Sequence, residues 1–395
     1  MLVAEEIQEA PAQPVRNPLH KIVVGITHPQ TCLTLTGHLR SLREEGFEVT
    51  LVSSPGALST RTAEVEGVEA ISIPMHRGIA VIADMVTMVR LWRILRRIKP
   101  DLTEFSTPKA GLLGTLAARV AGVPRRVYML RGLKLERSRG LKHRLLLMSE
   151  RIAAACADVV LCNSASLRAE ASALGVCPEG KLKLLGSGSS NGVDVQRFAP
   201  GQNELGASLG LPADSPVVGF VGRLTRDKGV PELIEAFEMI RAAVPTVRLL
   251  LVGWFDEAED ALSAELQEQI KAHPQIHLTG FVSDTAPYYR AMDVMVLPTW
   301  REGFPNVVLE AAATGVPVVT TLATGSRDSV LPEVTGLLIP PGYPVAIGEA
   351  VLRLLRDGDL RWRMGLAARA WILEHFVDER VLGRTAAFYR SLLDS

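Results

Sequence analysis

Two basic side chains stand in a glycine-bounded turn that follows a short apolar run. The turn reads Gly-Arg-Leu-Thr-Arg-Asp-Lys-Gly over residues 222–229, after an expected strand at Val217–Val221 and before a helical pattern starting near Pro231. Glycine lets the backbone turn tightly, and the N–H groups at the start of a helix favour anions. Arg223 and Lys228 therefore predict a phosphate site. The alternative is an ordinary turn with two solvated cations.

Two carboxylates follow a second expected strand, Val294–Leu297, in the segment Arg-Glu-Gly-Phe-Pro-Asn-Val-Val-Leu-Glu. Pro305 suits the first turn of a helix, so we expect Glu302 in the preceding loop and Glu310 inside the helix. A carboxylate accepts hydrogen bonds and so matches the vicinal hydroxyls of a sugar or a ribose. A pair of solvated glutamates is the alternative.

Both motifs require a parallel sheet to hold them at one edge. From Lys21 onward, short β-branched apolar runs alternate with longer amphipathic stretches, the pattern of parallel strands joined by helices. Residues 186–216 lose this periodicity, and the alternation then restarts at Val217. We therefore expect an α/β protein in which two Rossmann-like, doubly wound parallel sheets face each other across an interdomain cleft.

The predicted organisation has five parts. In chain order they are a flexible tail (1–18), an N-terminal Rossmann-like domain (19–198), a linker (199–216), a C-terminal Rossmann-like domain (217–376) and a C-terminal helix that can return to the N-terminal domain (377–395). The tail is acidic and Pro-rich, unlike a secretion signal, and no apolar run approaches the ~18 residues that span a bilayer. The four cysteines lack metal or redox spacing. These features predict a cytoplasmic protein with reduced thiols.

Charge is balanced over the whole chain but not within it. The 395 residues contain 43 Lys and Arg and 43 Asp and Glu, so no global basic field is present to hold nucleic acid. Residues 1–200 contain 26 basic and 18 acidic side chains, which gives this half a formal charge of +8 and the remainder −8. The two halves therefore differ in their electrostatic surroundings.

The two motifs in this order, cations first and carboxylates second, form the patterns G-R-L-x(3)-K-G and E-x(7)-E. Further matches are Gly280-Phe281-Val282 followed by Asp284, Ala291-Met292-Asp293 and Gly315-Val316-Pro317-Val318-Val319. The second half thereby resembles the donor-binding domain of family 4 glycosyltransferases, which are retaining enzymes with the B-type glycosyltransferase fold. The resemblance extends from about Lys21 to the C-terminus.

This resemblance implies a nucleotide-diphosphate sugar as the donor, a UDP-hexose or UDP-N-acetylhexosamine. Arg223 and Lys228 would hold the diphosphate, and two fixed cations would stabilise the charge on the leaving group. Glu302 would bind the transferred sugar near its reacting carbon, and Glu310 would bind the ribose. The three catalytic residues would be Arg223, Lys228 and Glu302, and the remaining donor contacts would come from Phe281, Val282, Gly303, Phe304, Asn306 and Val307. Neither a cofactor nor a metal is expected, because the histidines show no ligand spacing.

The first half departs from the family at positions near the expected reaction centre. Arg131-Gly132 stands where many members have His-Gly, and an arginine cannot serve as a general base. Glu104 and Ser106 occupy positions where members often carry His. Glu104 and Glu136 are conceivable carboxylate nucleophiles, although a hydrogen-bonded structural role is the stronger interpretation. The acceptor-side residues implied by the resemblance are Thr27, Lys109, Arg131 and Glu136.

The segment Ile79–Lys99 combines Met, Trp, Leu and Ile with five cations, a mixture typical of an interfacial amphipathic helix. A core helix with a solvated basic end is the alternative. The first half also resembles bacterial members that build capsular or exopolysaccharide repeat units. The expected acceptor is therefore a glycan, or a sugar linked to polyprenyl diphosphate, reached at an anionic membrane surface on the inner face of the cytoplasmic membrane.

The sequence thus predicts a retaining glycosyltransferase of polysaccharide assembly. Two alternatives share the fold: a nucleotide-sugar 2-epimerase and a non-catalytic subunit that binds sugar nucleotides. A nicotinamide-dependent oxidoreductase does not fit, because the turn after the first expected strand lacks a G-x-G-x-x-G pattern.

Overall fold

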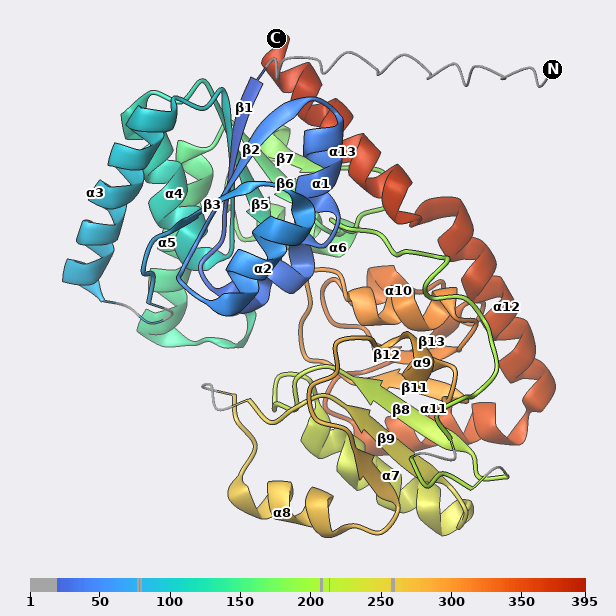
Figure 1. The fold of residues 1–395 in the computed structure, drawn as a ribbon. Coiled ribbons are helices and arrows are strands. Elements are labelled where there is room, and N and C mark those ends of the chain that lie inside the picture. Colours follow the sequence, from blue (N-terminus) through green and yellow to red (C-terminus); the bar gives the residue numbers. More distant parts are fainter. Residues whose placement is uncertain (1–19, 77, 79, 207–208, 213, 257–259) are drawn as a thin grey trace, which may run out of the picture.

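The computed structural model describes residues 20–76, 78, 80–206, 209–212, 214–256 and 260–395. The expected flexible tail at 1–18 and the first residue of the segment 79–99 lie outside these ranges. Two separate parallel sheets, each flanked by helices, stack one above the other along the molecule (Figure 1). The predicted fold class is confirmed.

The N-terminal sheet has seven parallel strands in the order β3-β2-β1-β4-β5-β6-β7. Helices α3, α4 and α5 lie on one side of this sheet, and α1, α2 and α13 lie on the other (Figure 1). The elements of this half are β1 (His20–Gly25), η1 (Pro29–Leu35), α1 (His38–Glu44), β2 (Phe47–Ser53), α2 (Ala57–Glu66), β3 (Glu69–Ser72), α3 (Val81–Ile98), β4 (Leu102–Ser106), α4 (Pro108–Ala121), β5 (Arg125–Leu130), η2 (Lys134–Arg137), α5 (Gly140–Cys156), β6 (Val159–Cys162), α6 (Ala165–Ala173), η3 (Glu179–Lys181) and β7 (Leu182–Leu184).

The C-terminal sheet has six parallel strands in the order β10-β9-β8-β11-β12-β13. The elements of this half and of the chain end are β8 (Val217–Val221), α7 (Val230–Ala243), β9 (Arg248–Val252), α8 (Ala264–Ala272), β10 (Ile276–Leu278), α9 (Ala286–Tyr289), β11 (Val294–Leu297), α10 (Asn306–Ala313), β12 (Val318–Thr321), η4 (Arg327–Ser329), β13 (Gly336–Ile339), α11 (Pro344–Arg356), α12 (Gly358–His375) and α13 (Asp378–Leu393). Strand β12 begins after Pro317, because proline has no N–H for the ladder.

The strands read as continuous apolar runs because helices cover both faces of each sheet. In β1, Ile22 and Val24 pack into the core under α1, whereas Val23 packs into the separate core on the α3–α4 side. Successive side chains of a strand point to opposite faces, so one short run of β-branched residues serves two cores.

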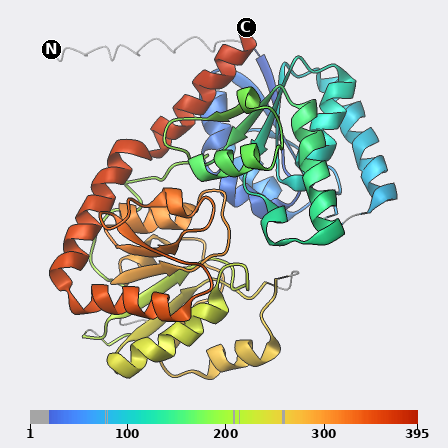
Figure 2. The same ribbon diagram turned by 180° about the vertical axis from the view of Figure 1, so that it is seen from behind.

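The chain crosses between the two halves twice, and the two crossings are hydrogen-bonded to each other. Val193 donates its N–H to the carbonyl of Phe376 at 2.8 Å, and Asp378 donates to the carbonyl of Val193 at 3.1 Å. After this point α13 runs back along the N-terminal half (Figure 2), where Ala386 and Tyr389 join its buried core. The end of the chain is therefore part of the N-terminal half.

Candidate active site

The two motifs meet because β8 and β11 are neighbouring strands whose carboxyl ends share one edge of the C-terminal sheet. Trp300 donates its backbone N–H to the carbonyl of Asp227 at 2.9 Å, and the Thr299 hydroxyl donates to the same carbonyl at 3.2 Å. Residues more than 70 positions apart in sequence thus form one surface.

Each predicted phosphate-binding cation is paired with a carboxylate. Lys228 Nζ lies 2.5 Å from Glu302 Oε1, and Arg223 Nη1 lies 2.6 Å from Asp256 Oδ2. The Lys228 and Glu302 side chains are 18% and 14% exposed, so both can be reached from the cleft. Sequence reasoning missed Asp256, although its place just after β9, at the same sheet edge as the two motifs, was a usable signal.

Asp227 is a second residue that sequence reasoning missed. Its side chain is buried, accepts a hydrogen bond from the Thr225 hydroxyl at 2.6 Å and lies 3.3 Å from Arg301 Nη2. Burial alone would raise the pKa of this carboxyl, but Lys228 foremost and then Thr225 and Arg301 lower it below its usual value. Asp227 therefore stays ionised and holds the two loops around the cation pair.

Glu310 lies in α10, where its Oε2 accepts hydrogen bonds from the Tyr289 hydroxyl at 2.8 Å and the Thr285 hydroxyl at 3.4 Å. Burial raises the pKa of Glu310, and the Tyr289 hydrogen bond opposes this only in part. The carboxyl is therefore oriented from one side by two fixed hydroxyls. The helix itself begins at Asn306, so Pro305 precedes it and does not form its first turn.

The other predicted donor residues of this half occupy different environments. Phe281 is 59% exposed and packs edge-on against Trp254, with 5.3 Å between ring centroids. Phe304 is buried and packs against Phe376. Asn306 and Val307 are partly exposed in the first turn of α10, as is Val282 in the turn after Gly280.

Arg131 and Gly132 meet the Glu302 loop across the interface between the halves. A Cβ on Gly303 would lie 2.1 Å from the Arg131 carbonyl oxygen, and a Cβ on Gly132 would lie 3.5 Å from the Gly303 nitrogen. Gly132 also has a φ of +132°, which side-chain-bearing residues rarely adopt. The backbones therefore approach at a distance that only glycine at 303 permits.

The Arg131 side chain points away from this contact into a buried network. It donates to Ser190 Oγ at 2.6 Å and lies 3.9 Å from Glu104 Oε1. Glu104 is fully buried, and its Oε2 lies 2.7 Å from both His38 Nε2 and the Tyr389 hydroxyl. Burial opposes ionisation, but His38, followed by Arg131 and Tyr389, lowers the pKa of Glu104 to about 2. This supports the structural interpretation of Glu104.

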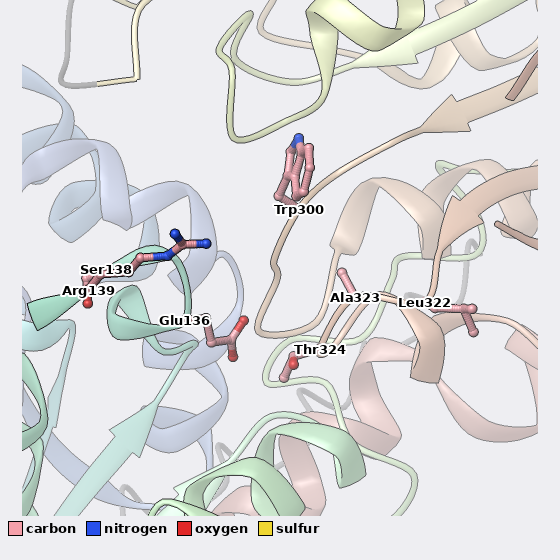
Figure 3. Close-up of a pocket in the computed structure, with 7 residues that line it drawn as sticks. All are labelled: Glu136, Ser138, Arg139, Trp300, Leu322, Ala323 and Thr324. Carbon is pink, nitrogen blue, oxygen red and sulfur yellow. The ribbon is translucent and has the colours of Figure 1, made fainter. Parts of the chain in front are cut away.

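A pocket of about 600 Å³ opens between the halves and includes Glu136, a predicted acceptor-side residue. Figure 3 shows the Glu136 carboxylate and Thr324 facing each other, with Trp300 on the loop after β11. The other lining residues are Ser138, Arg139, Leu322 and Ala323. Burial and then the charge of Glu170 raise the pKa of Glu136 to about 7, against the Thr324 hydrogen bond and the opposing charges of Arg301 and Arg327.

Thr27 and Lys109, the other predicted acceptor-side residues, are engaged within the N-terminal half. The Thr27 hydroxyl lies 2.6 Å from that of Thr107 and accepts the Ala110 N–H at 3.0 Å, which ties the end of β1 to the start of α4. Lys109 forms an ion pair with Asp84 of α3 at 2.7 Å and donates to the Gly78 carbonyl. Both residues therefore connect secondary-structure elements around the cleft.

The described part of the chain holds neither a metal-type cluster nor a membrane-spanning helix. Across these ranges, no three side chains of His, Cys, Asp or Glu come together as a metal site would require. Among the same residues, no helix is both long enough and apolar enough to cross a bilayer.

Comparison with known proteins gives matches to both halves. Residues 215–357 match the family described as glycosyl transferases group 1, and residues 34–188 match the glycosyl transferase 4-like domain. The chain is 34% identical over 375 residues to the capsular polysaccharide biosynthesis glycosyltransferase CapM of Staphylococcus aureus, with 94% of this chain and 97% of the relative covered.

A second relative and a solved structure extend this likeness. The UDP-Gal:alpha-D-GlcNAc-diphosphoundecaprenol alpha-1,3-galactosyltransferase of Escherichia coli is 30% identical over 349 residues, covering 85% of this chain and 88% of the relative. The structure of HepE from Anabaena in complex with UDP-glucose aligns with a TM-score of 0.79 at 22% identity, covering 94% of this chain and 99% of that chain. At this identity the structural likeness concerns the fold.

Proposed function

This chain belongs to the group 1 family of glycosyl transferases and is a glycosyltransferase; from that premise we propose that it transfers a hexosyl or N-acetylhexosaminyl group from a UDP-sugar to a lipid-linked glycan. The transfer retains the anomeric configuration and belongs to the assembly of a capsular or exopolysaccharide. The relatives named for capsule biosynthesis and for a diphosphoundecaprenol-linked acceptor support this assignment.

The donor diphosphate lies against Arg223 and Lys228 in this proposal. The bond between the anomeric carbon and the phosphate oxygen breaks, and its electron pair passes to the diphosphate. The acceptor oxygen bonds to the same face of the sugar, and its proton passes to the leaving phosphate. Phosphate oxygens share the two cations with Asp256 and Glu302, which hold them at 2.6 Å and 2.5 Å. Fixed cations are effective here because they need no reorganisation as charge develops.

Glu302 and Glu310 bind hydroxyls at two ends of the donor. Glu302 lies beside Lys228 and next to the Arg131–Gly132 backbone, and this position at the meeting point of the halves supports a role in binding the transferred sugar. Glu310, oriented by Tyr289 and Thr285, accepts from the ribose. The exposed ring of Phe281 offers a flat apolar surface for the base.

The acceptor sugar occupies the cleft pocket beside Glu136. Its carboxylate can accept a hydrogen bond from a sugar hydroxyl, and Oε1 is buried without a hydrogen-bond partner among the described residues. Trp300 supplies an aromatic wall in the same pocket. Thr27, Lys109 and Arg131 act on the acceptor side indirectly, by fixing the segments of the N-terminal half that their side chains join.

The lipid part of the acceptor is reached at an anionic membrane surface on its cytoplasmic face. Two helices of one side of the N-terminal half carry exposed apolar side chains: Val81, Ile82, Met85, Val86, Val89 and Trp92 on α3, and Leu141, Leu145, Met148 and Ile152 on α5. Exposed cations accompany them, namely Arg90, Arg93, Arg96 and Arg97 on α3 and Lys142 and Arg144 on α5. The acidic residues of the two helices are Asp84, paired with Lys109, and the buried Glu150. Exposed apolar and cationic side chains together suit an anionic lipid surface.

The pairing of Lys228 with Glu302, on a loop whose backbone packs against Arg131 and Gly132 of the other half, carries the proposal. Its test is product analysis with a panel of UDP-, GDP- and dTDP-sugars, with and without a polyprenyl-diphosphate-linked sugar. Transfer to the lipid-linked acceptor with retained configuration is the expected result. Release of a 2-epimerised free sugar, or nucleotide binding without turnover under every condition, would instead identify an epimerase or a binding subunit.

A further inference from the structure

One loop of the C-terminal half, residues 322–329, is hydrogen-bonded to the N-terminal half at two places; we call it the bridging loop. Gly325 donates its N–H to Ser166 Oγ at 2.7 Å. Ser166 in turn donates both its N–H, at 3.1 Å, and its hydroxyl to Asp328 Oδ2. Thr324 lies beside Glu136 of η2 in the pocket between the halves. The bridging loop is therefore hydrogen-bonded to the first turn of α6 and lies next to η2, two separate elements of the N-terminal half.

The bridging loop also sets the position of Glu302. The Thr324 carbonyl accepts the Glu302 N–H at 3.0 Å. A Cβ on Gly325, whose φ is +75°, would lie 2.3 Å from the Gly303 carbonyl oxygen and 2.6 Å from that of Glu302. The two backbones are packed so closely that a shift of the bridging loop must move Glu302.

The contact between Ser166 and Asp328 is suited to holding the loop in place. Ser166 is 5% exposed and lies in the first turn of α6, where N–H groups lack helical partners and negative charge is favoured. Asp328 supplies that charge from the opposite half. Loss of the Asp328 carboxylate would leave the N–H and the hydroxyl of the buried Ser166 without this acceptor, and loss of the Ser166 hydroxyl would leave the Gly325 N–H without its acceptor.

We propose that Ser166 and Asp328 are positioning residues for the transfer reaction, whose contact sets the closure at which Glu302 faces Arg131 and Gly132. This proposal rests on the proposed function, because it requires Glu302 at the reacting sugar. The contact acts through the bridging loop and not on the substrate.

Asp328→Ala removes both hydrogen bonds that Ser166 donates to the Asp328 carboxylate, whereas Ser166→Ala removes the bond from its hydroxyl and the bond from the Gly325 N–H. Each should lower kcat about 10- to 100-fold, because a displacement of about 1 Å can have an effect of that size. Calorimetric affinity for UDP should change less than about twofold, because the proposed nucleotide site lies on the C-terminal half alone. Asp328→Asn keeps an acceptor oxygen and should retain most of kcat. The double variant should be slowed by less than the product of the two single effects, because both changes remove the bond between the Ser166 hydroxyl and Asp328.

Glu268→Ala is the control, because it removes an exposed ion pair with Lys271 within the C-terminal half and should leave kcat unchanged. Unchanged kcat in both alanine variants at wild-type Tm overturns the proposal, as does a loss of UDP affinity equal to the loss of kcat. Small-angle scattering tests closure independently of activity, since Asp328→Ala should enlarge the radius of gyration and Glu268→Ala should not. If the wild-type enzyme transfers no sugar, the proposed function fails, and the scattering comparison still decides whether this contact holds the halves together.

Discussion

At the scale of single residues, each candidate phosphate-binding cation in the cleft forms an ion pair with a neighbouring carboxylate. Lys228 and Arg223 each have a carboxylate within 2.6 Å, and Asp227 holds the surrounding loops as a third anion. In the proposed mechanism, a nucleotide diphosphate would bring negative charge to the same cations and compete with Asp256 and Glu302 for them. The cations are therefore held in place before the donor arrives.

Replacing either cation should slow the reaction without unfolding the protein. We expect Arg223→Ala and Lys228→Ala each to lower sugar transfer about 100-fold or more, because each removes a charged contact to the leaving diphosphate. Arg226→Ala, an exposed cation of the same turn, is the matched control and should stay within about twofold of wild type. Steady-state kinetics with circular dichroism make the comparison, and near-wild-type rates in both site variants would refute the phosphate assignment.

The ionisation of Glu136 should appear in the pH dependence of transfer. Because burial and Glu170 raise the pKa of Glu136 to about 7, its carboxylate form is lost as the pH falls through that value. If the carboxylate accepts a hydroxyl of the acceptor, kcat/KM for the acceptor should rise between about pH 6 and pH 8 and then level off. Glu136→Gln should flatten and lower this profile.

Glu170→Gln provides the control for this profile. Removing the negative charge that raises the pKa of Glu136 should move the rise to lower pH and leave the plateau unchanged. A wild-type profile that is flat through this range, or a Glu136→Gln profile that keeps the rise, would contradict the acceptor role.

At the scale of elements, α3 and α5 expose apolar and cationic side chains that lie outside the buried core. Leu145 on α5 and Leu366 on α12 are each 51% exposed, but only Leu145 lies among the exposed apolar and cationic residues of α3 and α5. Because the two leucines are equally exposed, substitutions at these positions can test whether the surface of α3 and α5 binds lipid.

Leu145→Glu should weaken sedimentation with vesicles of equal parts phosphatidylglycerol and phosphatidylcholine at least about tenfold, whereas Leu366→Glu should not. Replacing Arg93, Arg96 and Arg97 together with Glu should abolish sedimentation at low salt, because each cation near an anionic surface contributes about 1 kcal/mol. Donor hydrolysis should survive in all three variants. A wild-type protein that does not bind these vesicles at low salt would show that α3 and α5 are ordinary surface helices.

At the scale of the whole molecule, the last helix joins the two halves. Helix α13 follows the C-terminal sheet in sequence, but its Tyr389 is fully buried in the N-terminal half and donates to Glu104 at 2.7 Å. The N-terminal core is therefore completed by residues that follow the C-terminal sheet in sequence.

Tyr389→Ala should lower the free energy of unfolding by about 3–5 kcal/mol, because it leaves a cavity and removes a hydrogen bond from a buried carboxylate. Ser391→Ala, in the exposed last turn of the same helix, should change it by less than about 0.5 kcal/mol. Urea denaturation followed by circular dichroism measures both. Equal midpoints for the two variants would show that α13 contributes little to the N-terminal core.

The sequence by itself determined the α/β class, the two sheets and the meeting of two motifs at one sheet edge. These features follow from local rules, because apolar runs indicate strands buried on both faces, and glycine and proline indicate turns. Because β8 and β11 are both followed by a helix, their carboxyl ends had to lie on the same edge. Residue types and spacing therefore singled out Arg223, Lys228, Glu302 and Glu310 as candidates, and the resemblance to the family implied their roles.

Only the tertiary structure decided how the two halves meet. Asp256 pairs with Arg223 from 33 residues away, Ser166 binds Asp328 from 162 and Tyr389 binds Glu104 from 285. The tertiary structure also shows that the Arg131 side chain points away from the cleft and that Phe304 is buried against Phe376. Periodicity and turn chemistry give information on neighbours within a few residues, whereas these contacts depend on how distant strands, loops and helices pack together in three dimensions, which no local pattern encodes.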